Sequence, residues 1–574
     1  MQIDETTGAP PQASPGSGES PPLTALATAA SAAAMLSGCF EEAIPTADEA
    51  SRFLSQAAPG HSLEDIRALT QMSYGDWIEA QFALPRERTH WDWLVYEARP
   101  KTPGIVAKVF LADMVYWSIW RRLITAPDLL RARVMFALSE IFVVAPGGLG
   151  NELQLQYLVG GFMDVLDEHA FGNFRDLLEA VSLNPAMGLY LSHAGNAKAD
   201  GSGRTPDENY AREILQLFSI GLYELNPDGT QKLGSDGQPI ETYGQEDIVK
   251  LARVFTGWNF DLPTFADSED PVTRLPMTMH EELHAHEDKD FLGAPIPGAT
   301  NGTQSLKLAL DFIFNHPNVG PFIGRQLIQR LVTSNPSPGY VGSVAKAFAD
   351  NGAGVRGDMK AVLRAILLSP EARLLPGLGD ATGKLREPAL RLAHFARAFH
   401  ATSENGLWRL HDRVSGLDHD LSDAATGLGQ QPMASPSVFN FFRPGYVPPN
   451  TAIAEAGLVA PEFQIVNETS VIGYLNFMQS LIVDGLRDNV GSATVKPYAL
   501  KPDYAGWLPL ADQPVQLVAQ LSSVFTASRL QPADAQAMAD AIAQIAAGDD
   551  AGRSRRVQAA ALLVLGAPAF LVQQ

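Results

Sequence analysis

Apolar side chains recur every three to four residues along almost the whole chain after residue 46. This helical period limits the fold more than any other feature of the sequence. Many of the periodic stretches also carry acidic residues near their starts, as helices do. The sequence therefore predicts a mainly α fold. The predicted helices span residues 47–56, 62–70, 74–82, 105–125, 127–144, 153–170, 173–182, 206–220, 246–256, 306–315, 321–333, 340–350, 359–369, 387–399, 468–485, 515–526, 532–547 and 553–565.

One segment departs from the helical pattern. Between residues 222 and 243, the turn sequences Asn-Pro-Asp-Gly (226–229) and Ser-Asp-Gly (235–237) interrupt short alternating stretches. This arrangement predicts one or two short β-hairpins near residues 222–243. No long linker rich in Pro, Gly or Ser divides the chain after residue 45. We therefore expect one large multi-helix domain at residues 46–574, with possible lobes at 46–400 and 401–574.

Residues 1–45 form a different kind of segment. Residues 1–22 are rich in Pro, Gly and Ser, which predicts disorder. The uncharged stretch after them ends in Leu36-Ser37-Gly38-Cys39, which resembles the lipobox of bacterial lipoproteins. We therefore expect lipidation at Cys39 and export to the periplasm or outer membrane. The segment lacks the positively charged start of a signal peptide, so the alternative is a disordered Ala-rich leader on a cytoplasmic protein.

The charge balance and the cysteine count exclude several classes of function. Lys and Arg number 42 against 64 Asp and Glu, which gives a net charge of −22. A chain this acidic is repelled by phosphate backbones, so nucleic acid is not an expected partner. The single cysteine excludes a disulfide framework and every multi-Cys metal site. No G-x-S-x-G or G-x-x-x-x-G-K-[ST] motif occurs, and no G-x-G-x-x-G follows a predicted strand, which disfavours α/β-hydrolase and nucleotide chemistry.

Several longer phrases carry a family resemblance. They are Phe-Arg-Asp-Leu-Leu-Glu-Ala-Val (174–181) with Asn-Pro-Ala-Met (184–187), Asp-Glu-Asn-Tyr-Ala-Arg-Glu (207–213) leading into 222–229, Leu-Ala-Arg-Val-Phe-Thr-Gly-Trp (251–258), and the block from His-Pro-Asn-Val-Gly (316–320) to Asn-Pro-Ser-Pro (335–338). Together they resemble the bacterial family catalogued as domain of unknown function 1800, from about residue 47 onward. The resemblance names no activity. It implies export, and it implies a partner from unknown-function family 1501, which looks like alkaline phosphatases and sulfatases.

The first candidate site is the predicted helix 206–220. Thr205 is placed to cap it and Gly221 to end it. At 100° per residue, one arc of this helix is polar and the opposite arc is apolar. The polar arc holds Glu208, Asn209, Arg212, Glu213 and Gln216, and the apolar arc holds Tyr210, Ile214, Leu217 and Phe218. Glu208, Arg212 and Glu213 are candidate catalytic residues that face a cavity, and Asn209 is a candidate ligand-binding residue. The alternative is a solvated face with a Glu208–Arg212 ion pair.

The second candidate site is a histidine cluster. Residues His280 to His284 match H-E-x-x-H, which on a helix places two imidazoles beside a zinc ion. Pro276 and Gly293 flank this segment and leave little room for such a helix. The family resemblance instead points to His286 and Glu287 as metal or ligand-binding residues. A divalent metal is thus a candidate cofactor, with His280 and His284 as weaker ligands, and the alternative is a solvated acidic loop.

Two further segments offer binding groups. Arg386 and Arg391 belong to a small basic island and can clamp a carboxylate, sulfate or phosphate, unless they pair with local acids. The amide-rich stretch 428–432 and the aromatic residues Phe439, Phe442 and Tyr446 predict a loop packed on the core. The alternative for this loop is a groove lining, because aromatic rings beside amides suit carbohydrate.

These features support two hypotheses of different classes. In the first, the protein is an exported, hydrolase-like enzyme that acts on a cell-surface or periplasmic glycan. In the second, it is a non-catalytic envelope protein that binds a surface polysaccharide or escorts a phosphatase- or sulfatase-like partner. An enzyme is expected to gather its titratable residues in one concave pocket with perturbed pKa values, whereas a scaffold is expected to leave them scattered.

Overall fold

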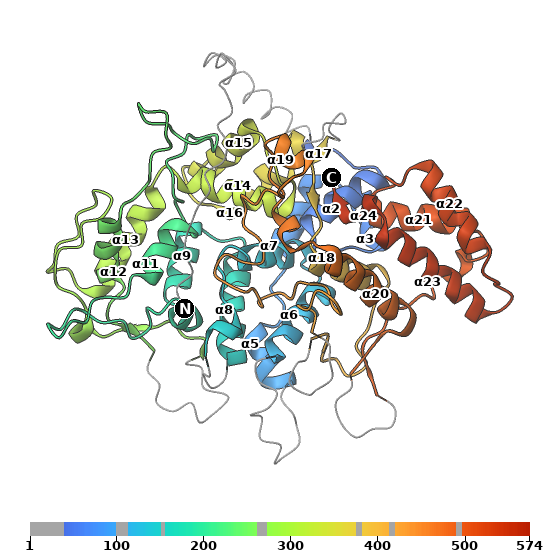
Figure 1. The fold of residues 1–574 in the computed structure, drawn as a ribbon, viewed down its shortest axis with the longest axis horizontal. Helices are drawn as coiled ribbons and strands as arrows, with labels where there is room; N and C mark the ends of the chain where they lie inside the picture. The colour runs from blue at the N-terminus through green and yellow to red at the C-terminus, as the bar shows by residue number, and fades with distance from the viewer. Residues whose placement is uncertain are drawn as a thin grey trace.

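The computed structural model describes residues 40–98, 113–150, 155–260, 273–374, 382–411, 420–488 and 496–574. Within these ranges the chain is mainly α-helical, which confirms the predicted fold class (Figure 1). The α-helices are α2 (Ala47–Ala57), α3 (Leu63–Leu69), α4 (Tyr74–Ala83), α5 (His90–Trp93), α6 (Met114–Thr125), α7 (Leu129–Ser139), α8 (Leu155–His169), α9 (Phe174–Ser182), α10 (Pro185–Tyr190), α11 (Asn209–Gln216), α12 (Gln245–Val254), α13 (Gly302–Asn315), α14 (Val319–Leu331), α15 (Pro338–Ala349), α16 (Met359–Leu367), α17 (Pro370–Arg373), α18 (Pro388–Ala398), α19 (Ala452–Glu455), α20 (Glu468–Asp484), α21 (Pro514–Thr526), α22 (Pro532–Ala543), α23 (Asp550–Gly566) and α24 (Pro568–Leu571).

Shorter elements join these helices. They are the π-helix η1 (Leu94–Ala98), the 3₁₀ helices η3 (Pro146–Gly148), η5 (Glu281–Leu283), η6 (Pro461–Ile465) and η7 (Leu508–Leu510), and the strands β1 (Trp258–Asn259), β2 (Thr278–Met279), β3 (Lys384–Leu385), β4 (Leu486–Arg487), β5 (Tyr498–Leu500) and β6 (Val572–Gln573). In the described ranges the strands form three antiparallel pairs, β1 with β2, β3 with β6, and β4 with β5. The sequence did not indicate these pairs, because strands of two or three residues are too short to show alternation.

Local capping chemistry sets where many helices begin. Thr46 and Glu49 form a reciprocal capping box at α2, in which Glu49 Oε2 accepts a hydrogen bond from Thr46 N at 2.8 Å. Ser62 and Asp65 form the same box at α3. Ser337 caps α15, whose first residue is a proline. Because such signals are local, the predicted helices 47–56 and 62–70 agree closely with α2 and α3.

The core is centred on α7, which is buried along its whole length. Helix α7 packs on α4 and α8, and α6 packs on α18. Figure 1 shows these central helices between a group that contains α9, α11, α12 and α13 and a group that contains α20 to α23. Helix α2 packs on α21, and β3 pairs with β6, so two distant parts of the chain both contact its C-terminal region. One contiguous buried cluster extends from Ala50 to Phe570.

The predicted hairpins near residues 222–243 are present as short antiparallel bridges. Tyr223 pairs with Glu241, Leu225 with Gln231, and Leu233 with Pro239. Backbone hydrogen bonds of 2.8 Å from Glu224 to Ile240 and from Lys232 to Glu224 connect the three segments. The segment therefore folds back twice, as its two turn sequences predict.

The N-terminal predictions fall outside the described residues. Cys39 and the rest of residues 1–39 belong to this part of the chain, as does the start of the predicted helix 105–125. Lipidation and export therefore stay predictions. Among the residues that are described, no helix is both long and apolar enough to cross a bilayer.

Candidate functional site

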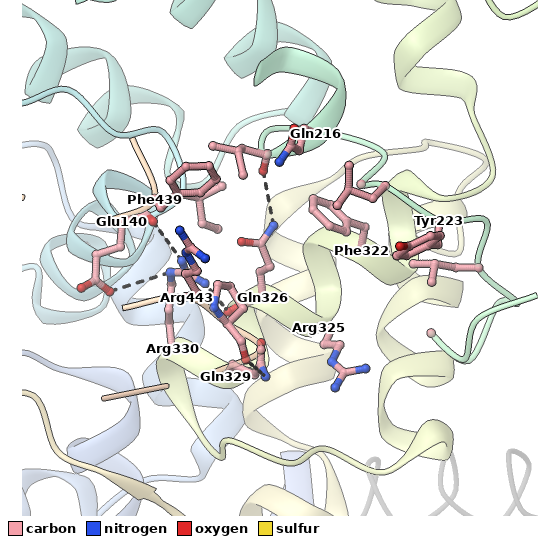
Figure 2. Close-up of a pocket in the computed structure, with 18 of the residues that line it drawn as sticks. Glu140, Gln216, Tyr223, Phe322, Arg325, Gln326, Gln329, Arg330, Phe439 and Arg443 are labelled. Atoms are coloured by element: carbon pink, nitrogen blue, oxygen red, sulfur yellow. Dashed lines mark hydrogen bonds and ion pairs between the residues drawn. The ribbon is translucent and has the colours of Figure 1, made fainter. Parts of the chain in front are cut away.

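A pocket of about 640 Å³ is lined by α14, by the ends of α7 and α11, and by the loop 438–445. Residues 221–243, which follow α11 and which we call the hairpin segment, also contribute to its lining. We call this pocket the α14 pocket; Figure 2 shows it. Its described lining includes the glutamines Gln216, Gln231, Gln326 and Gln329, the aromatic residues Tyr223, Phe322 and Phe439, the arginines Arg325, Arg330 and Arg443, and one carboxylic acid, Glu140.

Helix α14 supplies one wall of the α14 pocket. Phe322, Arg325, Gln326, Gln329 and Arg330 are spaced by three or four residues, so their side chains share one face of the helix. The opposite wall includes Gly221, which lies between the end of α11 at Gln216 and the hairpins near residues 222–243. Gly221 has a φ of +73°, and a Cβ there would lie 2.6 Å from the ring of Phe322. Glycine is therefore required for the hairpin segment to pass this close to α14.

The amides of this wall are held by backbone carbonyls. Gln326 Nε2 donates to Leu217 O at 3.5 Å. Gln329 Nε2 donates to Ser334 O at 3.0 Å and to Pro444 O at 3.2 Å, which ties α14 to the loop 438–445. The fold thus fixes the orientation of the Gln326 and Gln329 amides in the wall of the α14 pocket.

The floor of the α14 pocket is formed by Glu140 and Arg330, which Figure 2 shows side by side. Arg330 Nη2 donates to Glu140 O at 2.9 Å, and its Nη1 donates to Gln326 O at 3.2 Å. The Arg330 Nε to Glu140 Oε2 distance is longer, 3.8 Å, and Nε itself has no hydrogen-bond acceptor within the described structure. Both residues are buried.

The two floor residues belong to a larger group of six buried charged residues, which we call the buried charge cluster. Its members are Arg133, Glu140, Arg330, Lys384, Glu387 and Glu462. Lys384 Nζ lies 2.9 Å from Glu462 Oε1 and 3.5 Å from Glu387 Oε1, and it donates to Arg330 O at 2.7 Å. Arg133 donates to the same carbonyl. The cluster thus joins α7, α14, β3, η6 and the start of α18 through charged side chains.

Two carboxyl groups of the buried charge cluster, Glu140 and Glu387, have pKa values that are shifted in opposite directions. Burial, and then the charge of Glu387, raise the pKa of Glu140 well above its ordinary value. Although burial opposes it, the charge of Lys384 lowers the pKa of Glu387, which also accepts a hydrogen bond from Gln430 Nε2 at 2.8 Å. Glu140 is therefore the more readily protonated of the two.

The polar arc that the sequence indicated is divided in the structure. Arg212 Nη2 lies 3.3 Å from Glu208 Oε2, with 40% and 34% of the two side chains exposed. Gln245 Nε2 also donates to Glu208 Oε2, at 2.6 Å. An ion pair this exposed contributes only about 0–1 kcal/mol to stability. Asn209 is exposed. The α14 pocket is lined by Gln216, about two turns further along, and not by Glu208, Arg212 or Glu213.

Unlike Glu208 and Arg212 on the same arc, Glu213 is buried, with 6% of its surface exposed. Burial raises the pKa of Glu213, and its Oε2 has no hydrogen-bond donor in the described structure. Burial, followed by the charge of Glu213, raises the pKa of Tyr243 to about 12. Nothing in these contacts tests a catalytic role for Glu208, Arg212 or Glu213, which stays a prediction.

The predicted extent of this helix is wrong at both ends. Helix α11 begins at Asn209 and ends at Gln216, so Thr205 does not cap it. Asp207 is held elsewhere, because its backbone N donates to Asn196 Oδ1 at 2.9 Å and its carbonyl accepts from Asn196 Nδ2 at 3.2 Å. The predicted burial of Tyr210, Ile214 and Phe218 is confirmed. Leu217 is half-buried instead and lines the α14 pocket.

The buried side of α11 makes stability depend on pH. His193 stacks on Tyr210, with ring centroids 3.9 Å apart, and burial lowers the pKa of His193 to about 4. In the unfolded chain its pKa is near 6.5, so on acidification the unfolded state binds the proton first. Above about pH 6.5 His193 is neutral in both states, so the free energy of unfolding is not reduced, whereas about 3 kcal/mol of it is lost as the pH falls to 4.

Urea unfolding at pH 7 and pH 5 checks this effect of His193. Between these two pH values, the loss in the free energy of unfolding is expected to be about 2 kcal/mol smaller for His193→Gln than for the wild type. An equal loss in both proteins would contradict it.

The structure does not place the H-E-x-x-H motif on an α-helix. The motif starts at His280 and passes through the short 3₁₀ helix η5. His284 is fully buried, and its Nδ1 lies 2.8 Å from Thr256 O. His286 and Glu287 are exposed. Among the described residues, no three His, Cys, Asp or Glu side chains come together in a way that could hold a metal ion. A zinc-protease helix at this position is therefore wrong, and the geometry gives no support to the four expected metal ligands.

Arg386 and Arg391 are core residues. Both are buried, and their guanidinium groups lie over the rings of Phe570 and Tyr474, at 4.7 and 5.0 Å from the ring centroids. Burial lowers the pKa of Arg386 to about 9. Arg391 Nε donates to Arg386 O at 2.7 Å. Both guanidinium groups are thus held in the core, which gives no support to a clamp for an external anion. They stack on aromatic rings, and the charges of Glu387 and Glu462 also act on Arg391, as the alternative of local acids predicts.

The sequence left two alternatives for the aromatic loop, packing on the core or lining a groove, and the loop 438–445 does both. Phe442 is buried in the core, whereas Phe439 lines the α14 pocket. The amides of Gln430 and Gln431 are buried. Gln430 Nε2 donates to Glu387 Oε2 at 2.8 Å, so it supports the buried charge cluster and not a groove.

No curated protein and no solved structure matches the chain. The family model described as "Protein of unknown function (DUF1800)" matches residues 52–572, a range that includes the α14 pocket and the buried charge cluster. This confirms the resemblance seen in the sequence, and the chain therefore belongs to the DUF1800 family of proteins of unknown function.

Proposed function

We propose that this protein binds an oligosaccharide in the α14 pocket. The observation that carries the proposal is the combination of three aromatic side chains and four glutamines in one pocket of about 640 Å³. Sugar rings present apolar faces that pack on aromatic rings, and their hydroxyl groups pair with amides. A pocket of this volume has the size of a small-ligand site.

The carboxyl groups support binding more than hydrolysis. Glycoside hydrolysis ordinarily uses two carboxyl groups on opposite sides of the scissile bond. Among the described residues that line the α14 pocket, Glu140 is the single carboxylic acid, so a second carboxyl group is missing from this lining. Of the two hypotheses from the sequence, non-catalytic binding is therefore the one we propose.

Hydrolysis is the second candidate because of one observation. A carboxylic acid with a raised pKa in the wall of a pocket is a candidate general acid, and Glu140 is such a group. The two candidates differ in a simple readout, because only an enzyme releases shorter products from a bound oligosaccharide.

We also propose a location and a partner for this binding activity. The Leu36-Ser37-Gly38-Cys39 motif supports lipidation at Cys39 and a place in the periplasm or outer membrane. The family resemblance supports a phosphatase- or sulfatase-like protein of family 1501 as the partner.

Removal of an aromatic ring is expected to weaken binding. Tyr223 is 37% exposed and Phe439 is half-buried, so Tyr223→Ala and Phe439→Ala are expected to leave the fold intact. Each variant is expected to raise the Kd for the oligosaccharide about tenfold, which corresponds to about 1.4 kcal/mol. Isothermal titration of the purified protein against a panel of plant, algal and bacterial oligosaccharides measures this effect, and chromatography of the mixtures detects any cleavage.

A matched control separates this effect from general damage. Tyr96 is an aromatic residue of η1 that is 57% exposed and lies outside the α14 pocket, so Tyr96→Ala is expected to bind like the wild type. Failure of every oligosaccharide in the panel to bind, or unchanged binding in both pocket variants, would overturn the proposal.

A further inference from the structure

We propose that the ligand of the α14 pocket is an anionic oligosaccharide, whose carboxylate or sulfate groups are recognised by Arg325, Arg330 and Arg443. This inference rests on the proposed function and adds the chemical class of the ligand. The inference rests on the charged groups at the rim of the α14 pocket, at its floor and in the hairpin segment beside it.

Two arginines at the rim are not neutralised by the protein. Arg325 and Arg443 are both exposed and both line the α14 pocket. In the described part of the chain neither guanidinium group makes an ion pair. The guanidinium of Arg443 lies over the ring of Phe439, 4.8 Å from its centroid, which places a cation directly beside a surface suited to a sugar ring. Guanidinium groups bind carboxylate and sulfate oxygens through paired hydrogen bonds.

The floor of the α14 pocket adds a third cation, which is only loosely paired. The described lining holds three arginines and one carboxylic acid, Glu140. Arg330 Nε lies 3.8 Å from Glu140 Oε2 and has no hydrogen-bond acceptor within the described structure. Burial raises the pKa of Glu140, which favours its neutral form and weakens the negative charge beside Arg330.

Two acids of the hairpin segment are engaged by their own neighbours. Glu224, in the hairpin segment, pairs with Lys232 at 3.1 Å. Asp228 accepts hydrogen bonds from Thr230 N at 3.0 Å and from Thr230 Oγ1 at 2.6 Å, so it is engaged within its own turn. The excess of cations does not follow from composition, since the whole chain carries a net charge of −22. A positive pocket in an acidic protein attracts an anion and leaves neutral ligands unaffected.

The test compares oligosaccharides that share a sugar backbone and differ in charge. Oligogalacturonides and their methyl esters form one matched pair, and sulfated and desulfated galactan oligosaccharides form the other. Isothermal titration with the full-length protein is expected to show binding about tenfold tighter for the charged member of at least one pair, with the preference falling as salt is added. Preference within the first pair identifies the anion as a carboxylate, and preference within the second identifies it as a sulfate.

Variants locate the effect. The double variant Arg325→Gln/Arg443→Gln is expected to lose most of the preference for the charged member while it still binds the neutral one. Arg555→Gln is the matched control, because Arg555 is an exposed arginine of α23 outside the α14 pocket, and it is expected to keep the preference.

The possible failures are distinguishable. If neutral and charged members bind equally well, the inference about charge is wrong and the proposed function stands. If the charged member is preferred equally by the wild type and by the double variant, recognition by these arginines is wrong. If no oligosaccharide of either kind binds, the proposed function fails and the inference fails with it.

Discussion

Replacement of Lys384 by methionine is expected to lower the free energy of unfolding by about 3–5 kcal/mol. Lys384 is 97% buried, with 3% of its surface exposed, and its ammonium group contacts Glu462, Glu387 and the carbonyl of Arg330. Methionine is similar in length and apolar, so the variant leaves no large cavity. The cost arises because the carboxylates of Glu387 and Glu462 stay buried after their cation is removed.

Urea unfolding at pH 7 measures this change in the free energy of unfolding. Two further variants show whether the change comes from the loss of the buried cation. Lys307→Met is the control, since Lys307 is 62% exposed and its pair with Asp311 is expected to contribute less than about 1 kcal/mol. The double variant Lys384→Met/Glu462→Gln is expected to recover part of the loss, because one of the stranded carboxylates is then neutral. A Lys384→Met protein as stable as Lys307→Met would contradict the role given to the buried charge cluster.

A loss of similar size is expected when Arg122 is replaced by methionine, again about 3–5 kcal/mol. Arg122 is almost fully buried in α6. Its two terminal nitrogens bind the two carboxylate oxygens of Asp128, and Nη2 also lies 2.7 Å from Asp167 Oδ1. One guanidinium group thus contacts two buried aspartates and links α6, α8 and the start of α7. Arg131 also contacts Asp128, and Arg86 contacts Asp167, each at a longer distance of 3.4 Å.

Thermal and urea unfolding of Arg122→Met test this prediction against Arg553→Met. The Arg553–Asp550 pair lies at the surface, with 83% of the Asp550 side chain exposed, and its loss is expected to change stability by less than about 1 kcal/mol. Addition of Asp128→Asn to Arg122→Met is expected to restore some stability. Equal stability of Arg122→Met and Arg553→Met would show that the buried pair is not needed.

The fold class could be predicted because helix signals are local. The predicted helix 173–182 corresponds to α9 (Phe174–Ser182), and 359–369 corresponds to α16 (Met359–Leu367), since each has an N-cap and a clear apolar stripe. The prediction failed at α11 because its start is decided by a distant residue. Asn196 binds the backbone of Asp207 and keeps residues before Asn209 out of the helix, and no local pattern reveals such a contact.

The candidate site was harder to predict because its parts are far apart in the sequence. Glu140, Arg330, Lys384 and Glu462 meet only after four separate segments pack together. Arg133 carried a signal, since a charged residue within an otherwise apolar helix must be compensated in the core. The sequence did indicate two of the pocket residues, Phe439 as part of an aromatic loop beside amides and Gln216 on the polar arc of the helix that became α11.

A crystal structure of the protein with its tightest-binding oligosaccharide tests the central claim most directly. We predict electron density for the sugar in the α14 pocket, with a ring against Phe439 or Tyr223 and an anionic group within hydrogen-bond distance of Arg325 or Arg443. Density at another place, such as the polar face of α11 beside Glu208 and Arg212, with no ligand in the α14 pocket, would contradict it.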